Sequence, residues 1–515
     1  MKFLVLGFSA GLALAAAAPA SAQTLLVAWQ ACTGEGQVSL VQQINGCSNV
    51  IGSGLETPKP RAVAFFNRAV LYQSQGAISQ ALADYNEAVR LDPSQGQSFS
   101  GRASAYFDQA DYVRAGSDYE QALRLAPDAP NGWAGRGAVR LAQGQGRAAL
   151  ADYDKAVALA PQSADMLDRR GAAYAQTGDD TRALADFDHA LRIKADDASA
   201  LTGRGGVLAR RGDVDGALRA YDAAVRSEPD LGSALSGRGW ARRAKGDVAG
   251  SAADYAQVAT LTPRDAQAQF NHGFSLSMAG DLDGAVAAYT AAVARDPQDA
   301  GAYNNRGDAL ASRGDLKGAV ADFDKALELR PGYALALANR GRARLQLGEF
   351  QTAAADFGEL LKRDPADVTA RLSLAIAHGA RGANAQAVAE ADAAVQRAPG
   401  SAQALNIRCW ARGLSGEGLD QALADCDRAA ALKADAPEVY DARGFVRLRR
   451  GELDLALADY GTALRLRPQL ASARFGQGLA ELRLGHEAQG RTDMAAAAAA
   501  EPKIAADFAR YGLTP

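Results

Sequence analysis

The chain has 515 residues, of which 48% are hydrophobic, and its 56 basic and 59 acidic side chains give a net charge of −3. A nearly balanced charge without a polybasic stripe argues against nucleic acid or an anionic membrane surface as the main partner. Alanine and glycine are abundant and aromatic residues make up only 7%, a composition that favours closely packed helices over sheets.

Residues 1–22 have the form of an export signal. Lys2 supplies a positive charge, an apolar run follows from Phe3 to Ala18, and Ala20-Ser21-Ala22 is a small-residue cleavage site. The apolar run is shorter than the roughly 20 residues that a membrane span needs, so we expect a cleaved leader and no integral membrane segment in the mature chain. The leader is of bacterial type and predicts a periplasmic or secreted protein, in a compartment where disulfides form.

Prolines mark a period of 34 residues along most of the chain. Alanine takes the proline slot at Ala195 and Ala434, and one extra residue lies within 413–418. The spacing predicts thirteen repeats over residues 62–504. The prolines in register are Pro93, Pro127, Pro161, Pro229, Pro263, Pro297, Pro331, Pro365, Pro399, Pro468 and Pro502.

Each repeat predicts two helices, because apolar and small residues recur twice at the spacing i, i+4, i+7. In the eighth repeat the second set is Ala319, Phe323 and Ala326, and Gly314-Asp315 stands before it. Glycine can end the first helix in the left-handed conformation, and the acid can cap the second. The same pair or a close relative recurs at Gly178-Asp179, Gly212-Asp213, Gly246-Asp247, Gly280-Asp281, Gly348-Glu349 and Gly451-Glu452.

A small–aromatic–small set in the second helix completes the pattern, which resembles the tetratricopeptide repeat family over residues 62–504. The resemblance implies an all-α fold: an α-solenoid, forming a right-handed superhelix of about 13 tandem 34-residue helix-turn-helix repeats, whose first helices line a concave groove. The set occurs at Ala81-Tyr85-Ala88, Ala115-Tyr119-Ala122, Ala149-Tyr153-Ala156, Ala183-Phe187-Ala190, Ala217-Tyr221-Ala224, Ala285-Tyr289-Ala292, Ala319-Phe323-Ala326 and Ala456-Tyr460-Ala463.

The segments outside the repeats are interpreted as covers for the ends of the solenoid. Residues 23–61 form an N-terminal, cysteine-containing capping segment and residues 505–515 a C-terminal one. Ala391 replaces the aromatic residue in repeat ten, and Gly490 and Met494 mark an atypical repeat thirteen, so we expect looser stacking in both repeats.

The four cysteines allow three pairings. In the family's repeat, the positions of Cys409 and Cys426 face each other, so these two form the natural pair, and Cys32 then pairs with Cys47 by elimination. The alternative, four inert thiols, conflicts with the export signal.

A ladder of charges runs through the repeats. An arginine precedes the close-contact residue of most first helices, and an aspartate precedes the aromatic of most second helices. Such regularity favours structural pairing between helices over an anion-binding groove. The arginines are Arg68, Arg102, Arg136, Arg170, Arg204, Arg238, Arg306, Arg340, Arg408 and Arg443; the acids are Asp84, Asp118, Asp152, Asp186, Asp254, Asp322, Asp356 and Asp459.

The resemblance implies that a ligand contacts positions two, five, six, nine, twelve and thirteen of each repeat. Asn271, Asn305 and Asn339 hold position six in three consecutive repeats and could bind a peptide backbone; alternatively, asparagine is only a helix-start consensus residue. The candidate binding residues at these positions are Trp240, Arg243, Phe270, Asn271, Phe274, Asn304, Asn305, Asp308, Asn339, Arg342, Asn406, Trp410, Asp441 and Phe445.

Function is expected to be binding. The sequence has no recognisable catalytic constellation, metal cluster or cofactor motif, so we do not expect an enzyme. The leading hypothesis is a monomeric extracytoplasmic scaffold or adaptor for a protein or peptide ligand. A self-assembling structural protein, joined through the Ala-rich last repeat, is the alternative, and an enzyme with an unrecognised site is a weaker one.

Overall fold

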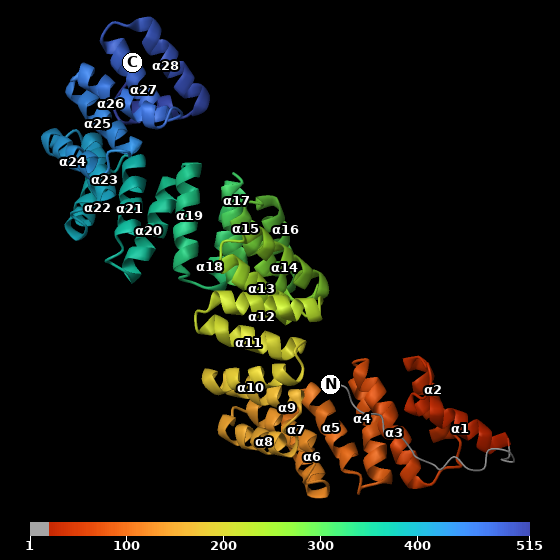
Figure 1. Ribbon diagram of the computed structural model, residues 1–515. Coiled ribbons are helices and arrows are strands. Elements are labelled where there is room, and N and C mark those ends of the chain that lie inside the picture. The colour runs from red at the N-terminus through yellow and green to blue at the C-terminus, as the bar shows by residue number, and fades with distance from the viewer. Residues whose placement is uncertain (1–19) are drawn as a thin grey trace. The chain divides into compact units, whose positions relative to one another are not determined.

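The computed structural model describes residues 20–515, and all the regular secondary structure within that range is helical. The chain forms two compact units, one ending at Leu261 and one beginning at Thr262. Within each unit, consecutive helices pack against one another along the chain (Figure 1). Most of the leader predicted at residues 1–22 lies outside the described residues.

The first unit contains helices α1 to α14. Their bounds are α1 Ala20–Thr33, α2 Leu40–Gly52, α3 Pro58–Ser74, α4 Ile78–Leu91, α5 Gly96–Asp108, α6 Tyr112–Leu125, α7 Pro130–Ala142, α8 Gly146–Leu159, α9 Ala164–Gln176, α10 Asp180–Ile193, α11 Ala198–Arg210, α12 Val214–Ser227, α13 Gly232–Ala244 and α14 Val248–Leu261.

The second unit contains helices α15 to α29. Their bounds are α15 Ala266–Ala279, α16 Leu282–Arg295, α17 Ala300–Ser312, α18 Leu316–Leu329, α19 Ala334–Leu347, α20 Phe350–Arg363, α21 Val368–Ala380, α22 Asn384–Arg397, α23 Ala402–Ser415, α24 Leu419–Leu432, α25 Pro437–Arg450, α26 Leu453–Leu466, α27 Ala471–Arg483, α28 Glu487–Ala500 and α29 Ile504–Arg510. Helices α3 to α28 make thirteen consecutive pairs, in step with the predicted repeats.

A glycine followed by an acid forms the turn inside most pairs. Gly314 has φ of 92°, a left-handed conformation that suits glycine. The Asp315 carboxylate accepts a hydrogen bond of 3.0 Å from the Gly318 backbone N–H and so caps α18. Glu349 and Glu452 stand in the same place but make no such cap hydrogen bond. The predicted cap therefore forms where the acid is aspartate and not at these two glutamates.

The aromatic residue found in most second helices joins two repeats. Tyr221 is 6% exposed. A Cβ atom placed on Gly205 of the same repeat would lie 2.8 Å from the Tyr221 ring, and one on Gly237 of the next repeat would lie 2.3 Å from it. Because side chains cannot approach so closely, glycine at both positions lets the ring fill the space between the helices.

The predicted charge ladder is structural. The Arg170 Nε donates to Asp186 Oδ2 over 2.7 Å within its own repeat, and the Arg170 Nη1 donates to Asp154 of the preceding repeat over 2.9 Å. Arg204 lacks an acid in its own repeat, where Ala220 stands, and pairs with Asp188 instead. The other pairs are Arg68–Asp84, Arg102–Asp118, Arg136–Asp152, Arg238–Asp254, Arg306–Asp322, Arg340–Asp356, Arg408–Asp425 and Arg443–Asp459.

Both predicted disulfides are confirmed. Cys32 and Cys47 link α1 to α2 and are fully buried, and the cluster around them includes Leu71 of α3. Cys409 and Cys426 link the two helices of repeat eleven. The segment before the repeats is thus a disulfide-linked helix pair that packs on the first repeat.

The expected looser stacking is wrong for repeat thirteen and stays a prediction for repeat ten, where Ala391 is fully buried in α22. In repeat thirteen, a Cβ atom on Gly478 of α27 would lie 2.7 Å from the Gly490 carbonyl oxygen of α28. Without an aromatic ring between them, the two helices approach more closely and leave no gap.

Candidate binding surface on the first helices

The first-helix face is the surface formed by the groove positions of the first helix in each pair. Trp240 and Arg243 lie on α13 in the first unit, whereas the other candidate residues lie on α15, α17, α19, α23 and α25 in the second. The surface predicted over repeats six to nine therefore belongs to two units, and each part is considered by itself.

The aromatic candidates in repeats six and seven are half-buried. Trp240 packs against the cluster that contains Tyr221. The Phe270 ring lies 5.7 Å from the Tyr289 ring, and Phe274 packs against the same cluster. These rings thus contribute to packing between helices.

The asparagines hydrogen-bond to one another. Asn304 is 1% exposed and Asn339 is 6% exposed. The Asn339 Nδ2 donates to Asn304 Oδ1 over 3.1 Å, and the Asn339 Oδ1 accepts from Arg342. The Asn271 Oδ1 accepts from Gln267 on the half-exposed start of α15. At Asn339 this favours the structural interpretation; a ligand contact at Asn271 and Asn305 stays a prediction.

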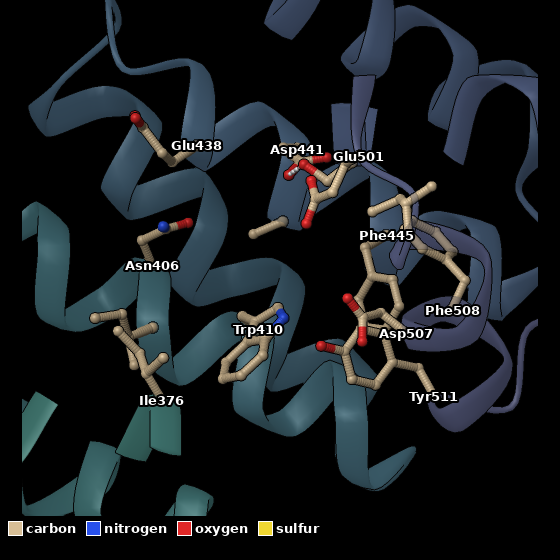
Figure 2. A pocket seen from close by; sticks show the side chains of 14 residues that line it. Ile376, Asn406, Trp410, Glu438, Asp441, Phe445, Glu501, Asp507, Phe508 and Tyr511 are labelled. Carbon is tan, nitrogen blue, oxygen red and sulfur yellow. Dashed lines mark hydrogen bonds between the residues drawn. The ribbon is translucent and has the colours of Figure 1, made fainter. Parts of the chain in front are cut away.

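The remaining candidates surround one pocket in the second unit. Asn406 and Trp410 of α23 and Asp441 and Phe445 of α25 line a cavity of about 390 Å³. Figure 2 shows these side chains around it, together with that of Glu501. We call this cavity the acidic pocket. The structure therefore brings together all four candidates of repeats eleven and twelve.

Helix α29 supplies the other wall of the acidic pocket. Phe508, which is 4% exposed, packs on Phe475 with a ring separation of 4.8 Å. The Tyr511 ring lies 5.9 Å from the Phe445 ring and 6.5 Å from the Trp410 ring. The segment predicted to cover the end of the last repeat thus also lies across the first helices α23, α25 and α27.

The acidic pocket is lined by four carboxylates, those of Glu438, Asp441, Glu501 and Asp507. Within residues 20–515 no lysine, arginine or histidine lines it. Burial above all, together with the nearby charge of Glu438, raises the pKa of Asp441 to about 6, although a 2.6 Å hydrogen bond from the Ser472 hydroxyl acts in the opposite direction. The electrostatic environment of this cavity is therefore unfavourable to further negative charge.

The first unit has a pocket that the sequence interpretation missed. It has a volume of about 660 Å³, and its lining includes Gln97 and Ser100 of α5, Asn131 of α7, and Asp165 and Arg169 of α9. These residues hold positions two, five and six of three consecutive repeats, so the same positional rule identifies them. None of these five residues is aromatic, whereas the candidates predicted in repeats six to nine and eleven to twelve include tryptophan and phenylalanine.

This mixed-charge pocket contains acidic and basic groups. The Arg169 Nε lies 3.0 Å from the Asp165 carboxylate, and Lys194 also lines the cavity. Beside it, the Ser199 hydroxyl donates to Asp168 over 2.7 Å, and burial raises the pKa of Asp168 to about 6. The Asp168–Ser199 pair occupies the same repeat positions as Asp441 and Ser472 in the second unit.

Between residues 20 and 515, no helix combines the length and the apolar character required to cross a membrane. No group of three His, Cys, Asp or Glu side chains in that range is arranged to hold a metal ion.

Comparison with known families gives a clear match. A profile described as "Tetratricopeptide repeat" matches residues 135–200, 202–269, 275–334 and 339–402, and a second profile with that description matches residues 62–95. Together the matches cover more than half of the chain. A comparison with curated proteins gives no significant match.

Several solved structures are similar. YrrB, described as a TPR protein with an unusual peptide-binding site, is 25% identical, with coverage of 36% of this chain and 95% of that chain and a TM-score of 0.34. Yeast Tom70 is 17% identical, with coverage of 81% and 95% and a TM-score of 0.38. The Cut9–Hcn1 hetero-tetramer of APC/C is 14% identical, with coverage of 88% and 96% and a TM-score of 0.40.

Proposed function

The chain belongs to the tetratricopeptide repeat family, and on that premise we propose that it is an extracytoplasmic scaffold or adaptor that binds peptide segments of other proteins on its first-helix face. Repeats of this family generally mediate protein or peptide binding and are typically not catalytic. The scaffold role proposed here is therefore a binding role, with no chemical step.

One observation carries the proposal: each unit has a pocket at the same positions of its first helices. Positions two, five and six of repeats two to four line the mixed-charge pocket, and positions two, five, six and nine of repeats eleven and twelve line the acidic pocket. Equivalent positions in successive repeats are spaced regularly, which suits an extended ligand whose backbone also repeats.

The extracytoplasmic location is supported by two features of the chain. The first is the leader-like sequence of residues 1–22. The second is that all four cysteines are in buried disulfides, which persist in oxidising compartments.

Selection of ligands from a displayed random-peptide library by residues 23–515 tests the binding role. Arg169→Glu should weaken peptides that use the first unit by about tenfold or more, since it reverses a charge in the pocket. Arg182→Glu is the matched control, because Arg182 is an exposed arginine of the second helix α10. Circular dichroism checks that both variants fold. Peptides that respond to Arg182→Glu, but to neither Arg169→Glu nor Trp410→Ala, would contradict the proposal.

A monomer is the proposed oligomeric state. Sedimentation of residues 23–515 should give a mass near that of one chain at every concentration. A stable dimer that dissociates when residues 505–515 are deleted would instead favour the self-assembling alternative, in which exposed alanines of α28 form the interface.

A further inference from the structure

The polar groups of the acidic pocket are suited to a positively charged partner. Its four carboxylates accept hydrogen bonds but cannot donate them when ionised. The Asn406 Oδ1 atom is buried and has no hydrogen-bond partner among residues 20–515, so it adds a further acceptor. A ligand that donates several hydrogen bonds would satisfy these groups, whereas an anion would meet repulsion from the carboxylates.

The chain neutralises only part of this charge. Glu438 pairs with Arg467 over 2.5 Å, and Asp507 pairs with Arg510 of its own helix. Asp441 receives only the Ser472 hydroxyl, and Glu501 has no ion pair with any residue between 20 and 515. The carboxylates of Asp441 and Glu501, both of which line the pocket (Figure 2), are therefore without a basic partner among residues 20–515.

Aromatic rings complete the lining. Trp410 and Tyr511 meet edge to face with an interplanar angle of 88°, and Phe445 and Tyr511 with one of 79°. The faces of such rings attract cations, most strongly where the site is shielded from water. Carboxylates beside aromatic faces form a chemical environment that favours an organic cation over a small hydrated metal ion, because the rings offer no ligand atoms to a metal.

We propose that the acidic pocket binds the basic side chain, arginine or lysine, of a peptide that lies on the first-helix face of the second unit. The proposal rests on the proposed peptide-binding function and specifies the ligand of this one pocket. Its volume of about 390 Å³ lies within the range of cavities that hold small ligands. Helix α29 and the residue that follows it then form a wall of the binding site as well as a cover, because α29 contributes Asp507 and the next residue is Tyr511.

The probe is the acetylated and amidated pentapeptide Gly-Ser-Arg-Ser-Gly, with the same peptide carrying citrulline as the control. Citrulline keeps the shape of arginine but has no charge, so the pair isolates the cation. Titration of residues 23–515, followed by NMR at low ionic strength, should give an affinity at least tenfold higher for the arginine peptide. The difference should shrink as salt is added. Propylguanidinium, a free cation, should bind more weakly than the arginine peptide.

Two variants of the acidic pocket, Asp441→Asn and Glu501→Gln, and one control variant in the first unit test where the arginine peptide binds. Asp441→Asn should reduce the affinity for the arginine peptide about tenfold and should leave the affinity for the citrulline peptide unchanged. Asp168→Asn is its match in the first unit, at the same repeat position and with the same serine partner, and should change neither affinity. Glu501→Gln should also reduce the affinity for the arginine peptide. Because Glu501 is exposed, this second test does not depend on a substitution inside the fold.

Equal binding of the arginine and citrulline peptides would overturn the proposal, as would unchanged binding by Asp441→Asn and Glu501→Gln. Propylguanidinium that binds as tightly as the arginine peptide would overturn the assignment to a peptide side chain. Library-selected peptides that still bind the chain and respond to Arg169→Glu would leave the proposed function intact in either case. A failure of all peptides, selected or basic, would count against both proposals.

Discussion

The two units present the same repeat positions but make different pockets from them. In the first unit, polar residues of both charges surround a pocket of about 660 Å³ formed mainly by repeat residues. In the second unit, the last helix α29 packs across α23, α25 and α27. The cavity of about 390 Å³ that remains is lined by carboxylates and aromatic rings. A repeated scaffold thus keeps its backbone geometry while the groove side chains and the terminal segment decide what each part can bind.

The largest expected effect concerns the helix that distinguishes the second unit. Phe508→Ala should destabilise the region around α23, α25 and α27 by about 3–5 kcal/mol, since it removes a buried aromatic ring. Hydrogen exchange should become faster there and stay unchanged in α5, α7 and α9, because repeat proteins are stabilised by neighbouring repeats. Phe107→Ala, at a half-buried ring of α5, is the control and should affect only the first unit. Faster exchange throughout both units would contradict a local role for α29.

The charge ladder should be common to both units. Arg170→Ala in the first unit and Arg306→Ala in the second should each cost about 2–3 kcal/mol, because each leaves a buried aspartate, Asp186 or Asp322, without its charged donor. Arg204→Ala, whose acid Asp188 is more exposed, should cost less than about 1 kcal/mol. Local stability from hydrogen exchange gives the three values. A large difference between Arg170→Ala and Arg306→Ala would mean that the units differ in scaffold as well as in groove.

The asparagines at position six of the repeats differ in role: Asn339 is expected to stabilise the fold, whereas Asn271 is available to contact a ligand. Asn339→Ala should destabilise the second unit by about 1–3 kcal/mol, because Asn304 Oδ1 loses its buried donor. Asn271→Ala, at a half-exposed site, should change stability by less than about 0.5 kcal/mol. Thermal unfolding of the two variants makes the comparison. If the Asn339→Ala variant had the same melting temperature as the unaltered chain, the hydrogen bond between Asn304 and Asn339 would not contribute to the stability of the fold.

The smallest effect depends on pH and should have the same sign in both units. Burial raises the pKa values of Asp168 and Asp441 to about 6, above the ordinary value of 3.8. The folded state therefore resists ionisation of these groups, and their contribution to stability decreases as the pH rises from about 4 through 6. Asp168→Asn and Asp441→Asn should each raise stability by about 1–2 kcal/mol at pH 8, because solvent contact moderates the penalty, and should bring no gain at pH 4. Melting temperatures of the variants and of the unaltered chain between pH 4 and pH 8 test this prediction. An equal gain in stability at both pH values would exclude ionisation of the aspartates as the cause.

The sequence was sufficient to predict the helix pairs, the turn glycines, the charge ladder and both disulfides. Apart from the Cys32–Cys47 disulfide, which was predicted by elimination, each depends on contacts at fixed separations within a repeat, as between Arg170 and Asp186 or Cys409 and Cys426. A period of 34 residues shows thirteen times which positions face each other, so local pattern and packing carry the same information.

Groove chemistry was predicted only in part. Asn406, Trp410, Asp441 and Phe445 do meet at one pocket, because the positional rule is local to adjacent repeats. The mixed-charge pocket was missed because its glutamine, asparagine and charged residues resemble an ordinary solvated helix surface. The bond between Asn304 and Asn339 was also missed, because it depends on how far consecutive first helices are separated.

What the sequence by itself determined is the repeating scaffold, since short-range periodicity fixes which residues of adjacent helices touch. What only the tertiary structure decided is the use of that scaffold: the path of α29 back over α23 and α25, and the acidic pocket enclosed between them. Residues 504–511 follow no repeat, so their position depends on the apolar surface of Phe445 and Phe475 that the folded repeats present. Contacts between a non-repeating segment and distant repeats have no period to reveal them, and burial of Phe508 on the finished surface selects the arrangement.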